Sequence, residues 1–213
     1  MRKPVRTIAY LAAVASVLLV PAAQAQNLDE GLLDPAWFGD ARDWRQGGEF
    51  DYLWVNEGFS LDGKTVHVAA WEEPQFIGKP RDTKDRARAF ELTGNMPQWL
   101  RGAFASGLSG RAEVSTEGGD VRLEGRFVDV NAGNNAAKWL VGFGAGSANA
   151  TWDMRLVDAA TGEVLAAIHH RSVSGTNMSD IDDKIIKWMD EVLVPGLQTG
   201  LASVYSGAKP AKK

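Results

Sequence analysis

The stretch from Ala148 to Val173, ANATWDMRLVDAATGEVLAAIHHRSV, decides the fold class. Its first eleven residues or so alternate small or apolar side chains with polar ones, which is the period-two pattern of a half-buried β-strand. DAATG at residues 158–162 supplies a turn, and a second strand is expected from Glu163 to Val173. The sequence therefore predicts an antiparallel hairpin at this point.

A run of glycines, GFGAG at residues 142–146, precedes the hairpin. A phosphate-binding loop needs a helix after its glycines, because the N–H groups and dipole of that helix hold the anion. A period-two strand follows here instead, and the spacing GxGxxG is absent. Gly142, Gly144 and Gly146 are two residues apart, so an extended chain places them on one face, where another element can approach closely. We interpret them as a structural glycine strip, which also remains a candidate for lining a partner-binding groove.

Other segments of the chain have helix or strand periodicity. EGGD at residues 117–120 favours a hairpin, since glycine tolerates positive φ, and Gly94-Asn95 predicts the end of a helix. We expect strands at residues 65–71, 111–116 and 121–130, and helices at 82–92, 95–108 and 179–194. These elements indicate an α+β fold with a single, mostly antiparallel sheet and helices packed on one face.

Residues 1–25 have the organisation of a secretory signal peptide. Basic residues come first, an apolar run follows from Ile8 to Val20, and Ala23-Gln24-Ala25 is an A-x-A cleavage signature. The apolar run is shorter than the roughly 20 residues that a membrane-spanning helix needs. We therefore expect cleavage after Ala25 and a periplasmic or secreted protein without a stable membrane anchor.

The exported chain divides into an N-terminal arm (residues 26–63), an α+β domain (64–205) and a short basic, disordered tail (206–213). The arm holds three Trp, three Phe and one Tyr among nine acidic residues. Its aromatic rings either dock on the domain or form exposed platforms for a sugar or peptide ligand. The candidate binding residues of the arm are Trp37, Trp44, Tyr52 and Trp54.

Composition excludes several classes of function. The formal net charge is −4, and removal of the signal peptide takes it to about −7. Such an acidic protein is a poor partner for nucleic acid, which requires clustered Lys and Arg. There is no cysteine, so disulfides, thiol catalysis, zinc–thiolate sites and lipid attachment through cysteine are excluded.

The three histidines do not form a recognisable catalytic or metal-binding set. His169 and His170 are adjacent on a predicted strand, so their side chains point to opposite faces and do not easily chelate one metal. His67 lies opposite the apolar face of its strand, and no nucleophile motif G-x-S-x-G occurs. We predict no catalytic residues, no metal and no cofactor, with histidines exposed or satisfied within the core.

The acidic residues allow one alternative. Asp180, Asp182 and Asp183 open the last predicted helix, where carboxylates accept free backbone N–H groups and offset the dipole. They lack the spacing of a calcium loop. The alternative function is a hydrolase that acts on cell-wall or exported polymers through carboxylates, namely Glu72, Glu73 or Asp153.

The strand predicted at residues 121–130 has a charged face made of Arg122, Glu124 and Arg126. Such a face is ordinarily solvated, and its ion pairs stabilise the fold little. If helices leave this face uncovered, it is a natural docking surface.

Three segments of the sequence carry a resemblance: Gly125–Gly133, Lys138–Gly146 and Arg155–Leu165. Together they resemble a bacterial family known as domain of unknown function 4410, whose members are exported and often lipid-anchored. The family implies no reaction and no catalytic residues. This chain departs from many members because it lacks a lipid-attachment cysteine.

These observations together lead to one expected function. We expect a non-enzymatic, soluble, envelope-associated binding module whose partner is an envelope protein or a glycan. The arm and the glycine strip are its expected contact regions.

Overall fold

The computed structural model describes residues 26–28, 31–39, 42–47, 49–134, 146–174 and 180–211. Strands β1 (Gln26–Leu28) and β2 (Gly31–Leu33) pair with each other. All the other described strands form one eight-stranded sheet, in the order β10-β3-β4-β9-β8-β7-β5-β6. Their bounds are β3 Arg45–Gly47, β4 Phe50–Val55, β5 Thr65–Val68, β6 Glu113–Ser115, β7 Val121–Asn131, β8 Asn149–Asp158, β9 Val164–Val173 and β10 Lys209–Pro210.

The predicted hairpin is β8 and β9, which pair antiparallel along almost their whole length. The carboxylate of Asp158 accepts hydrogen bonds from the backbone N–H groups of Ala160 and Thr161, and Gly162 takes a positive φ of 77°. These contacts form the turn that DAATG predicts. On the outer sides, β8 pairs with β7 and β9 pairs with β4, so the hairpin is the centre of the sheet.

The sheet is mixed, which corrects the expectation of a mostly antiparallel sheet. β5 lies between β6 and β7 and runs parallel to both. The chain passes from β5 through a helix to β6, and such a crossover joins parallel strands. The hairpin expected between residues 111–116 and 121–130 is therefore wrong, because β5 separates its two strands.

The turn at residues 117–120 has a different partner from the one its sequence suggests. Asp120 exchanges two hydrogen bonds with Thr65, each 2.8 Å long, so the turn is attached to the start of β5. A Cβ atom on Gly119 would lie 2.7 Å from the carbonyl oxygen of Thr65. Glycine thus allows this segment to cross closely beside β5. Val66 and Val68 of β5 are fully buried. A neighbouring strand on each side helps to keep the apolar surface of β5 out of water, which stabilises this arrangement.

Helix α1 (Thr83–Gly107) is continuous, whereas two helices separated at Gly94-Asn95 were expected. Asp82 caps its start and accepts a 2.8 Å hydrogen bond from the N–H of Asp85. A glycine within a helix costs about 1 kcal/mol and a proline about 3 kcal/mol. One unbroken apolar face offsets this cost through packing, and its buried members are Ala89, Leu92, Met96, Pro97, Leu100 and Phe104.

The C-terminal helices are α3 (Ile181–Trp188), a π-helical turn η1 (Met189–Leu193), α4 (Val194–Thr199) and α5 (Leu201–Gly207). Asp180 caps α3 through a 2.6 Å hydrogen bond from the N–H of Ile181. Pro195 does not end the helical stretch, because η1 runs directly into α4 and Leu193 before it is helical. The chain changes direction at Gly200 instead, which has a positive φ of 88°.

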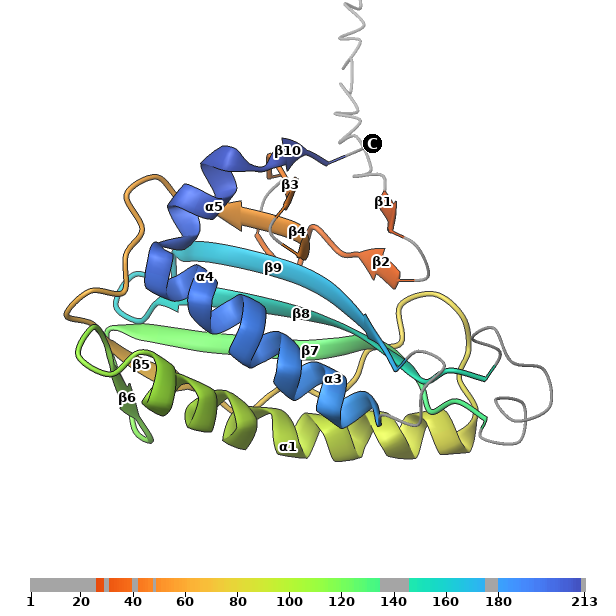
Figure 1. The fold of residues 1–213 in the computed structure, drawn as a ribbon. Coiled ribbons are helices and arrows are strands. Elements are labelled where there is room, and N and C mark those ends of the chain that lie inside the picture. The colour runs from red at the N-terminus through yellow and green to blue at the C-terminus, as the bar shows by residue number, and fades with distance from the viewer. Residues whose placement is uncertain are drawn as a thin grey trace, which may run out of the picture.

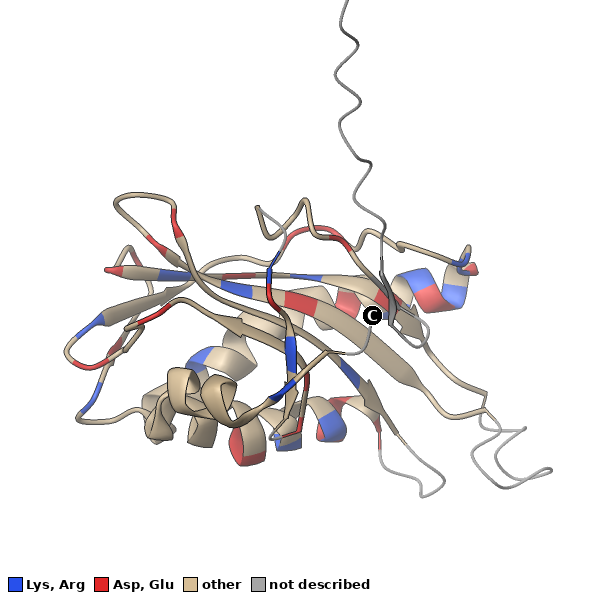
Figure 2. Ribbon diagram, turned by 90° about the horizontal axis from the view of Figure 1, so that it is seen from above, with Lys and Arg blue, Asp and Glu red and all other residues tan. Residues whose placement is uncertain are grey.

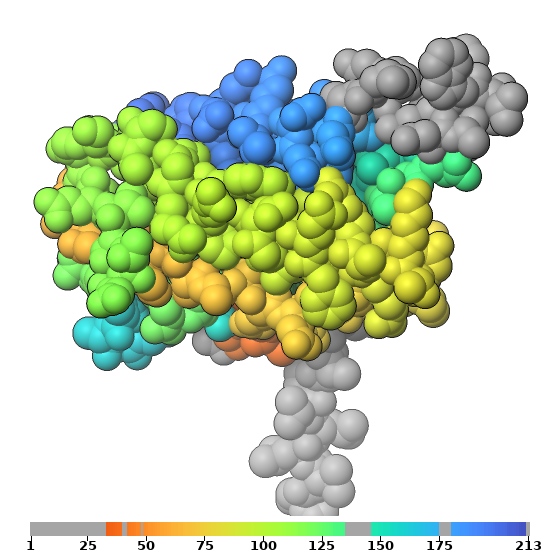
Figure 3. Space-filling view, turned by 90° about the horizontal axis from the view of Figure 1, so that it is seen from below, coloured from red at the N-terminus to blue at the C-terminus, as the bar shows by residue number. Residues whose placement is uncertain are grey.

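The helices and the N-terminal arm lie on different faces of the sheet. Figure 1 shows α1, α3 and α4 in front of the strands, and α1 packs on β7 while α3 packs on β9. Figure 3 shows the C-terminal helices along one side of α1 and the orange segment that precedes α1 along its other side. A second, smaller apolar cluster joins the arm to the sheet, made of Leu33, Phe38, Trp44, Tyr52 and Ala167.

Segments outside the expected α+β domain contribute to the sheet. β3 and β4 come from the arm, and Lys209 and Pro210 of the C-terminal tail pair with Gln46 and Arg45 of β3. Among the residues described, no helix is both long and apolar enough to cross a bilayer.

Candidate functional site

A row of polar side chains crosses the sheet on the face that the arm covers. Arg126 of β7 lies directly opposite Asp153 of β8, which lies opposite His169 of β9, which lies opposite Tyr52 of β4. Directly paired residues point to the same face of a sheet. The row is therefore a consequence of strand register, and we call these four residues the cross-strand row.

The cross-strand row is held together by short polar contacts. The guanidinium of Arg126 donates to the Asp153 carboxylate from Nε at 3.1 Å and from Nη2 at 3.0 Å. The other Asp153 oxygen lies 2.7 Å from Nδ1 of His169. The Tyr52 ring packs edge-on against His169, with centroids 6.0 Å apart. Every polar group of the Asp153 carboxylate thus has a partner, as a buried charge requires.

The burial of this row differs from the sequence expectation. The strand was expected to be half buried, with Asp153 and its polar neighbours in solvent, but the Asp153 side chain is 0% exposed and Arg126 only 6%. Arg126 and His169 bind both oxygens of Asp153, and Asp34 of the arm places its carboxylate 3.1 Å from Nη2 of Arg126. The charged face of β7 is thus uncovered by helices, as the docking hypothesis required, but partly covered by the arm.

Trp37 of the arm lies over two arginines of the sheet. Its ring centroid is 4.3 Å from the guanidinium carbon of Arg155 and 4.8 Å from that of Arg126, which is cation–π geometry. Its Nε1–H donates to both carboxylate oxygens of Glu72, at 2.9 and 3.0 Å. Arg155 also donates a hydrogen bond to the Trp37 carbonyl oxygen. Trp37 is only partly buried, so one part of this aromatic platform reaches the surface.

Glu124 of β7 belongs to the same arrangement, because it binds Arg155 and Arg122. Its carboxylate accepts from Nε of Arg122 at 2.5 Å and from Nε of Arg155 at 2.6 Å. Burial raises the pKa of Glu124, but the hydrogen bonds from the two arginines outweigh burial, so its pKa lies below its ordinary value. We use the name Trp37 cluster for Trp37, Glu72, Glu124, Arg126 and Arg155.

The other predicted aromatic residues of the arm divide into two groups. Trp44 and Tyr52 are buried in the smaller apolar cluster, where the Trp44 ring packs edge-on against Phe38 at 5.0 Å. Trp54 is partly buried, and the guanidinium of Arg42 lies 3.9 Å from its ring centroid. Trp37 and Trp54 therefore present stacked arginine–indole pairs near the surface, whereas Trp44 and Tyr52 pack the arm onto the sheet.

Gly146 is the described member of the glycine strip. Gly142 and Gly144 lie outside the described residues. Gly146 has a positive φ of 76°, and its carbonyl oxygen accepts a 2.9 Å hydrogen bond from the N–H of Asn134. Strand β8 follows it, so the helix that a phosphate-binding loop needs does not occur at this point.

The carboxylates of the alternative hydrolase have different surroundings. Asp153 is fully buried and bound to Arg126 and His169, so a polymer cannot reach it in this conformation. Glu72 is engaged by the indole of Trp37, while Glu73 is exposed beside it. Among the described residues, no group of three or more His, Cys, Asp or Glu side chains converges as a metal site would require.

His169 and His170 point to opposite faces, as predicted from their adjacency. His170 stacks on Trp188 of α3 at 4.4 Å, and its Nδ1 lies 2.8 Å from the carboxylate of Asp51. Burial raises the pKa of Asp51, but the hydrogen bond and charge of His170 and the N–H of Arg171 outweigh it, so the pKa is lowered. This second acid–histidine pair links the sheet to the helices and is not part of the Trp37 cluster.

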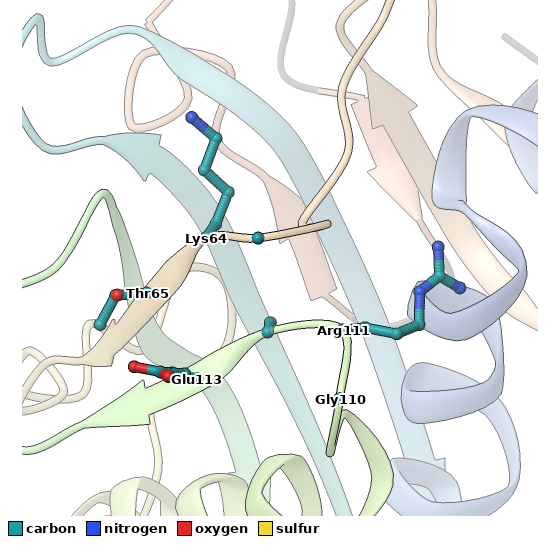
Figure 4. Close-up of a pocket in the computed structure, with 7 residues that line it drawn as sticks. Lys64, Thr65, Gly110, Arg111 and Glu113 are labelled. Atoms are coloured by element: carbon teal, nitrogen blue, oxygen red, sulfur yellow. The ribbon is translucent and has the colours of Figure 1, made fainter.

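Two surface hollows lie away from the Trp37 cluster. One is lined by residues 63–65 and 110–113, and Figure 4 shows the side chains of Lys64 and Arg111 pointing in different directions. Arg111 is bound to Asp62 at 2.7 Å. The other hollow lies between α1 and the C-terminal helices, beside Trp99 and Ile186. In neither hollow do the charged side chains converge as they do in the Trp37 cluster.

Sequence reasoning identified Trp37 and, separately, Glu72, Glu124 and Arg126, but not that these side chains meet. Arg122, Glu124 and Arg126 were noticed as an alternating charged face, and this signal was correct for their placement on one strand. Figure 2 shows Lys and Arg interspersed with Asp and Glu along the described elements. Charge pattern alone therefore could not single out Arg126 and Arg155 as the pair that receives the indole.

Comparisons with known proteins address the family and the fold. The model of the family described as Domain of unknown function (DUF4410) matches residues 55–176. No curated protein matches the chain. The PelC dodecamer from Paraburkholderia phytofirmans is similar with a TM-score of 0.46 and 12% identity, over 67% of this chain and 95% of that chain. A protein from Xanthomonas campestris, of the family DUF330, is similar with a TM-score of 0.42 and 15% identity, over 70% of this chain and 92% of that one.

Proposed function

This chain belongs to the family of the Domain of unknown function (DUF4410), whose description states no activity, and we propose from its own residues that it is a non-enzymatic binding module of the bacterial cell envelope. The match confirms the resemblance that the segments around residues 125–165 predicted. The proposed partner is an envelope protein or a glycan, bound at the Trp37 cluster.

The position of Trp37 is the observation that carries this proposal. Its indole is partly exposed, yet it is fixed by two arginines below it and by Glu72 at its edge. An aromatic ring held in one orientation gives contact area at little cost in conformational entropy, which is why Trp and Arg are frequent at the centres of interfaces. The charged groups around the ring supply hydrogen-bond donors and acceptors for the rim of such an interface.

Export is the second part of the proposal. It is supported by the basic residues, the apolar run and the A-x-A signature within residues 1–25. The acidic net charge makes nucleic acid an unsuitable partner. The protein is thus proposed to act in the periplasm or outside the cell, after cleavage behind Ala25.

A site-specific photo-crosslinking experiment tests the proposal. A benzophenone amino acid replaces Glu73, which is exposed beside Glu72, in the full chain expressed with its own residues 1–25. The control carries the same group at Phe90, which is 52% exposed on α1. We expect one reproducible envelope product from position 73 and none from position 90.

A substitution in the cluster then links the product to the proposed surface. Arg155→Gln removes one of the two cations under Trp37, and we expect it to reduce the yield at position 73 severalfold. Equal products at both positions, or a yield that does not change in Arg155→Gln, would show that the Trp37 cluster is not the binding surface.

A further inference from the structure

Residues 33–38 of the arm, which precede β3 and β4, are attached to the charged face of the sheet by contacts of the kind that a separate peptide makes. Asp34 pairs with Arg126 at 3.1 Å, the Trp37 ring covers Arg126 and Arg155, and Arg155 donates to the Trp37 carbonyl oxygen. Asp34 to Phe38 form a short turn, since the N–H of Trp37 donates to the Asp34 carbonyl at 3.2 Å. The contacts therefore come from one compact segment of a few residues.

The two arginines that receive this segment also have partners outside it. Asp153 holds the guanidinium of Arg126 through two hydrogen bonds, and Glu124 holds Arg155 through one of 2.6 Å. These partners all come from strands of the sheet rather than from the arm. A site whose side chains are already oriented binds more tightly, because less conformational freedom is lost on binding.

The family match contains the residues that bind the segment, but not the segment itself. The match at residues 55–176 includes Glu72, Glu124, Arg126 and Arg155, whereas Asp34 and Trp37 lie before it. The domain thus supplies a charged receiving surface, and a segment outside the matched region fills it.

Apolar contacts beside the charged ones define the occupant further. Leu33 and Phe38 flank the turn and are 1% and 0% exposed in the smaller apolar cluster. The complete recognition pattern is therefore an aliphatic residue and a carboxylate, followed three residues after the carboxylate by an indole and a second aromatic ring. In this chain the pattern is LDPAWF, residues 33–38.

We infer that residues 33–38 are an intramolecular ligand of the sheet, and that the site they fill takes a partner protein segment of the same acidic and aromatic chemistry. This inference rests on the proposed binding at the Trp37 cluster, and it specifies that the partner contacts Arg126 and Arg155 themselves, after the indole of Trp37 has left them. The partner segment displaces residues 33–38, pairs its carboxylate with Arg126 and stacks its indole on Arg126 and Arg155.

Tethering determines how this exchange depends on concentration. A covalently attached segment acts at an effective concentration on the order of millimolar, so it competes strongly with a free peptide. The free peptide binds only molecules whose site is open, so its apparent affinity is reduced in proportion to the fraction of such molecules. Weakening the arm must therefore strengthen the binding of a peptide in trans, which is the opposite of the effect expected when Trp37 itself is the contact surface.

The test uses the full chain and a fluorescently labelled peptide, GLLDPAWFG, which reproduces residues 31–39. Fluorescence anisotropy measures its binding to the wild-type chain and to Asp34→Ala/Trp37→Ala, in which the arm has lost its main polar anchors. We expect at least tenfold tighter binding to the double variant. Addition of Arg155→Gln should remove most of this gain, and a control peptide, GLLNPALFG, should bind at least tenfold more weakly.

Equal binding of the labelled peptide to the wild type and to the folded double variant would overturn the inference, and so would equal binding of the control peptide. If the double variant fails to fold, hydrogen exchange of the wild-type chain decides the question. Excess unlabelled peptide should speed exchange at the amides of Trp37 and Phe38, whose N–H groups are bonded within the turn. Unchanged exchange would overturn the inference.

Three further outcomes distinguish displacement of residues 33–38 from their exchange between two copies and from the proposed function itself. A wild-type dimer that forms by exchange of arms, and is lost in the double variant, would overturn the assignment to a separate partner. Specific crosslinking at position 73 without any peptide binding would leave the proposed function intact and reject the displacement. Peptide binding without an envelope product at position 73 would reject the proposed function alone.

Discussion

The carboxylate of Asp153 lies 2.7 Å from the imidazole of His169, directly across two antiparallel strands, and both side chains are buried. Arg126 completes the contact from the next strand. A polar row of this kind is unusual within a sheet that is covered on both faces, and its stability depends on every member having a partner.

The first prediction concerns the removal of charge from this row. Asp153→Asn leaves Arg126 as a buried cation without its main counter-charge, and we expect the free energy of unfolding to fall by about 3–5 kcal/mol. Asp34→Asn is the matched control, because Asp34 contacts the same guanidinium but is 33% exposed. Its effect should stay within about 1 kcal/mol. Urea unfolding measures both variants, and similar losses for the two would contradict the assigned difference in burial.

The second prediction concerns acid sensitivity at the Trp37 cluster. The pKa of Glu124 is lowered in the folded state, so its contribution to stability is present above its unfolded pKa, about 4.3, and is lost as pH falls through the folded value. The wild type should therefore exceed Glu124→Gln in stability at pH 6–8. This difference should shrink below about pH 4. Urea unfolding across this pH range provides the measurement, and a difference that persists unchanged at pH 2 would speak against the ion pairs.

The third prediction uses two glycines with different surroundings. A Cβ atom on Gly125 of β7 would lie 2.5 Å from the buried ring of Trp71, so Gly125→Ala should cost about 1–3 kcal/mol through forced repacking. A Cβ atom on Gly94 of α1 has no neighbour within 4 Å. Gly94→Ala should therefore stabilise the protein by about 0.5–1 kcal/mol. Thermal melting compares the two, and the prediction is wrong if both variants shift the melting temperature in the same direction.

The fourth prediction separates the buried tryptophan of the arm, Trp44, from the partly buried Trp54. Trp44 is 7% exposed and packs on Phe38, so Trp44→Ala should cost about 3–5 kcal/mol. Trp54 is partly buried beneath Arg42, and Trp54→Ala should cost no more than about 2 kcal/mol. Chemical unfolding of each variant checks the order. A larger loss of unfolding free energy for Trp54→Ala than for Trp44→Ala would contradict the assigned packing of Trp44 in the smaller apolar cluster.

The sequence predicted the β8–β9 hairpin because its signals are local. Alternation along each strand and the turn residues at 158–162 need only near neighbours in the chain. The same local logic failed at residues 111–130, where two strands and a glycine turn indicated a hairpin. The reason is that β5, which precedes them by about forty residues, lies between those strands, and no local signal reports such an insertion.

Helix α1 shows a second limit of local signals. Gly94 and Pro97 oppose helix formation within a few residues, and these propensities predicted a break. The apolar face that runs from Ala89 to Phe104 contributes more than the two unfavourable residues cost, because it packs against the sheet. Only the presence of that sheet makes the continuous helix the more stable arrangement.

The candidate site was predictable in its parts but not in its assembly. The aromatic arm and the alternating charges of β7 are visible in the sequence, and Trp37 was among the predicted residues. However, Asp34 and Arg126 are 92 positions apart, and no pattern in the sequence pairs them. The burial of Asp153 was missed for the same reason, since Arg126 and His169, which bind its carboxylate, lie on other strands.

The sequence by itself determined the α+β class, the central hairpin, the capped helix starts and the family, because periodicity, turn residues and characteristic segments act over short distances. The tertiary structure decided the parallel insertion of β5, the continuity of α1 and the meeting of Trp37 with Arg126 and Arg155. These features arise where segments far apart in the chain exclude water from each other, and the free energy of that burial exceeds the local preferences of the residues involved.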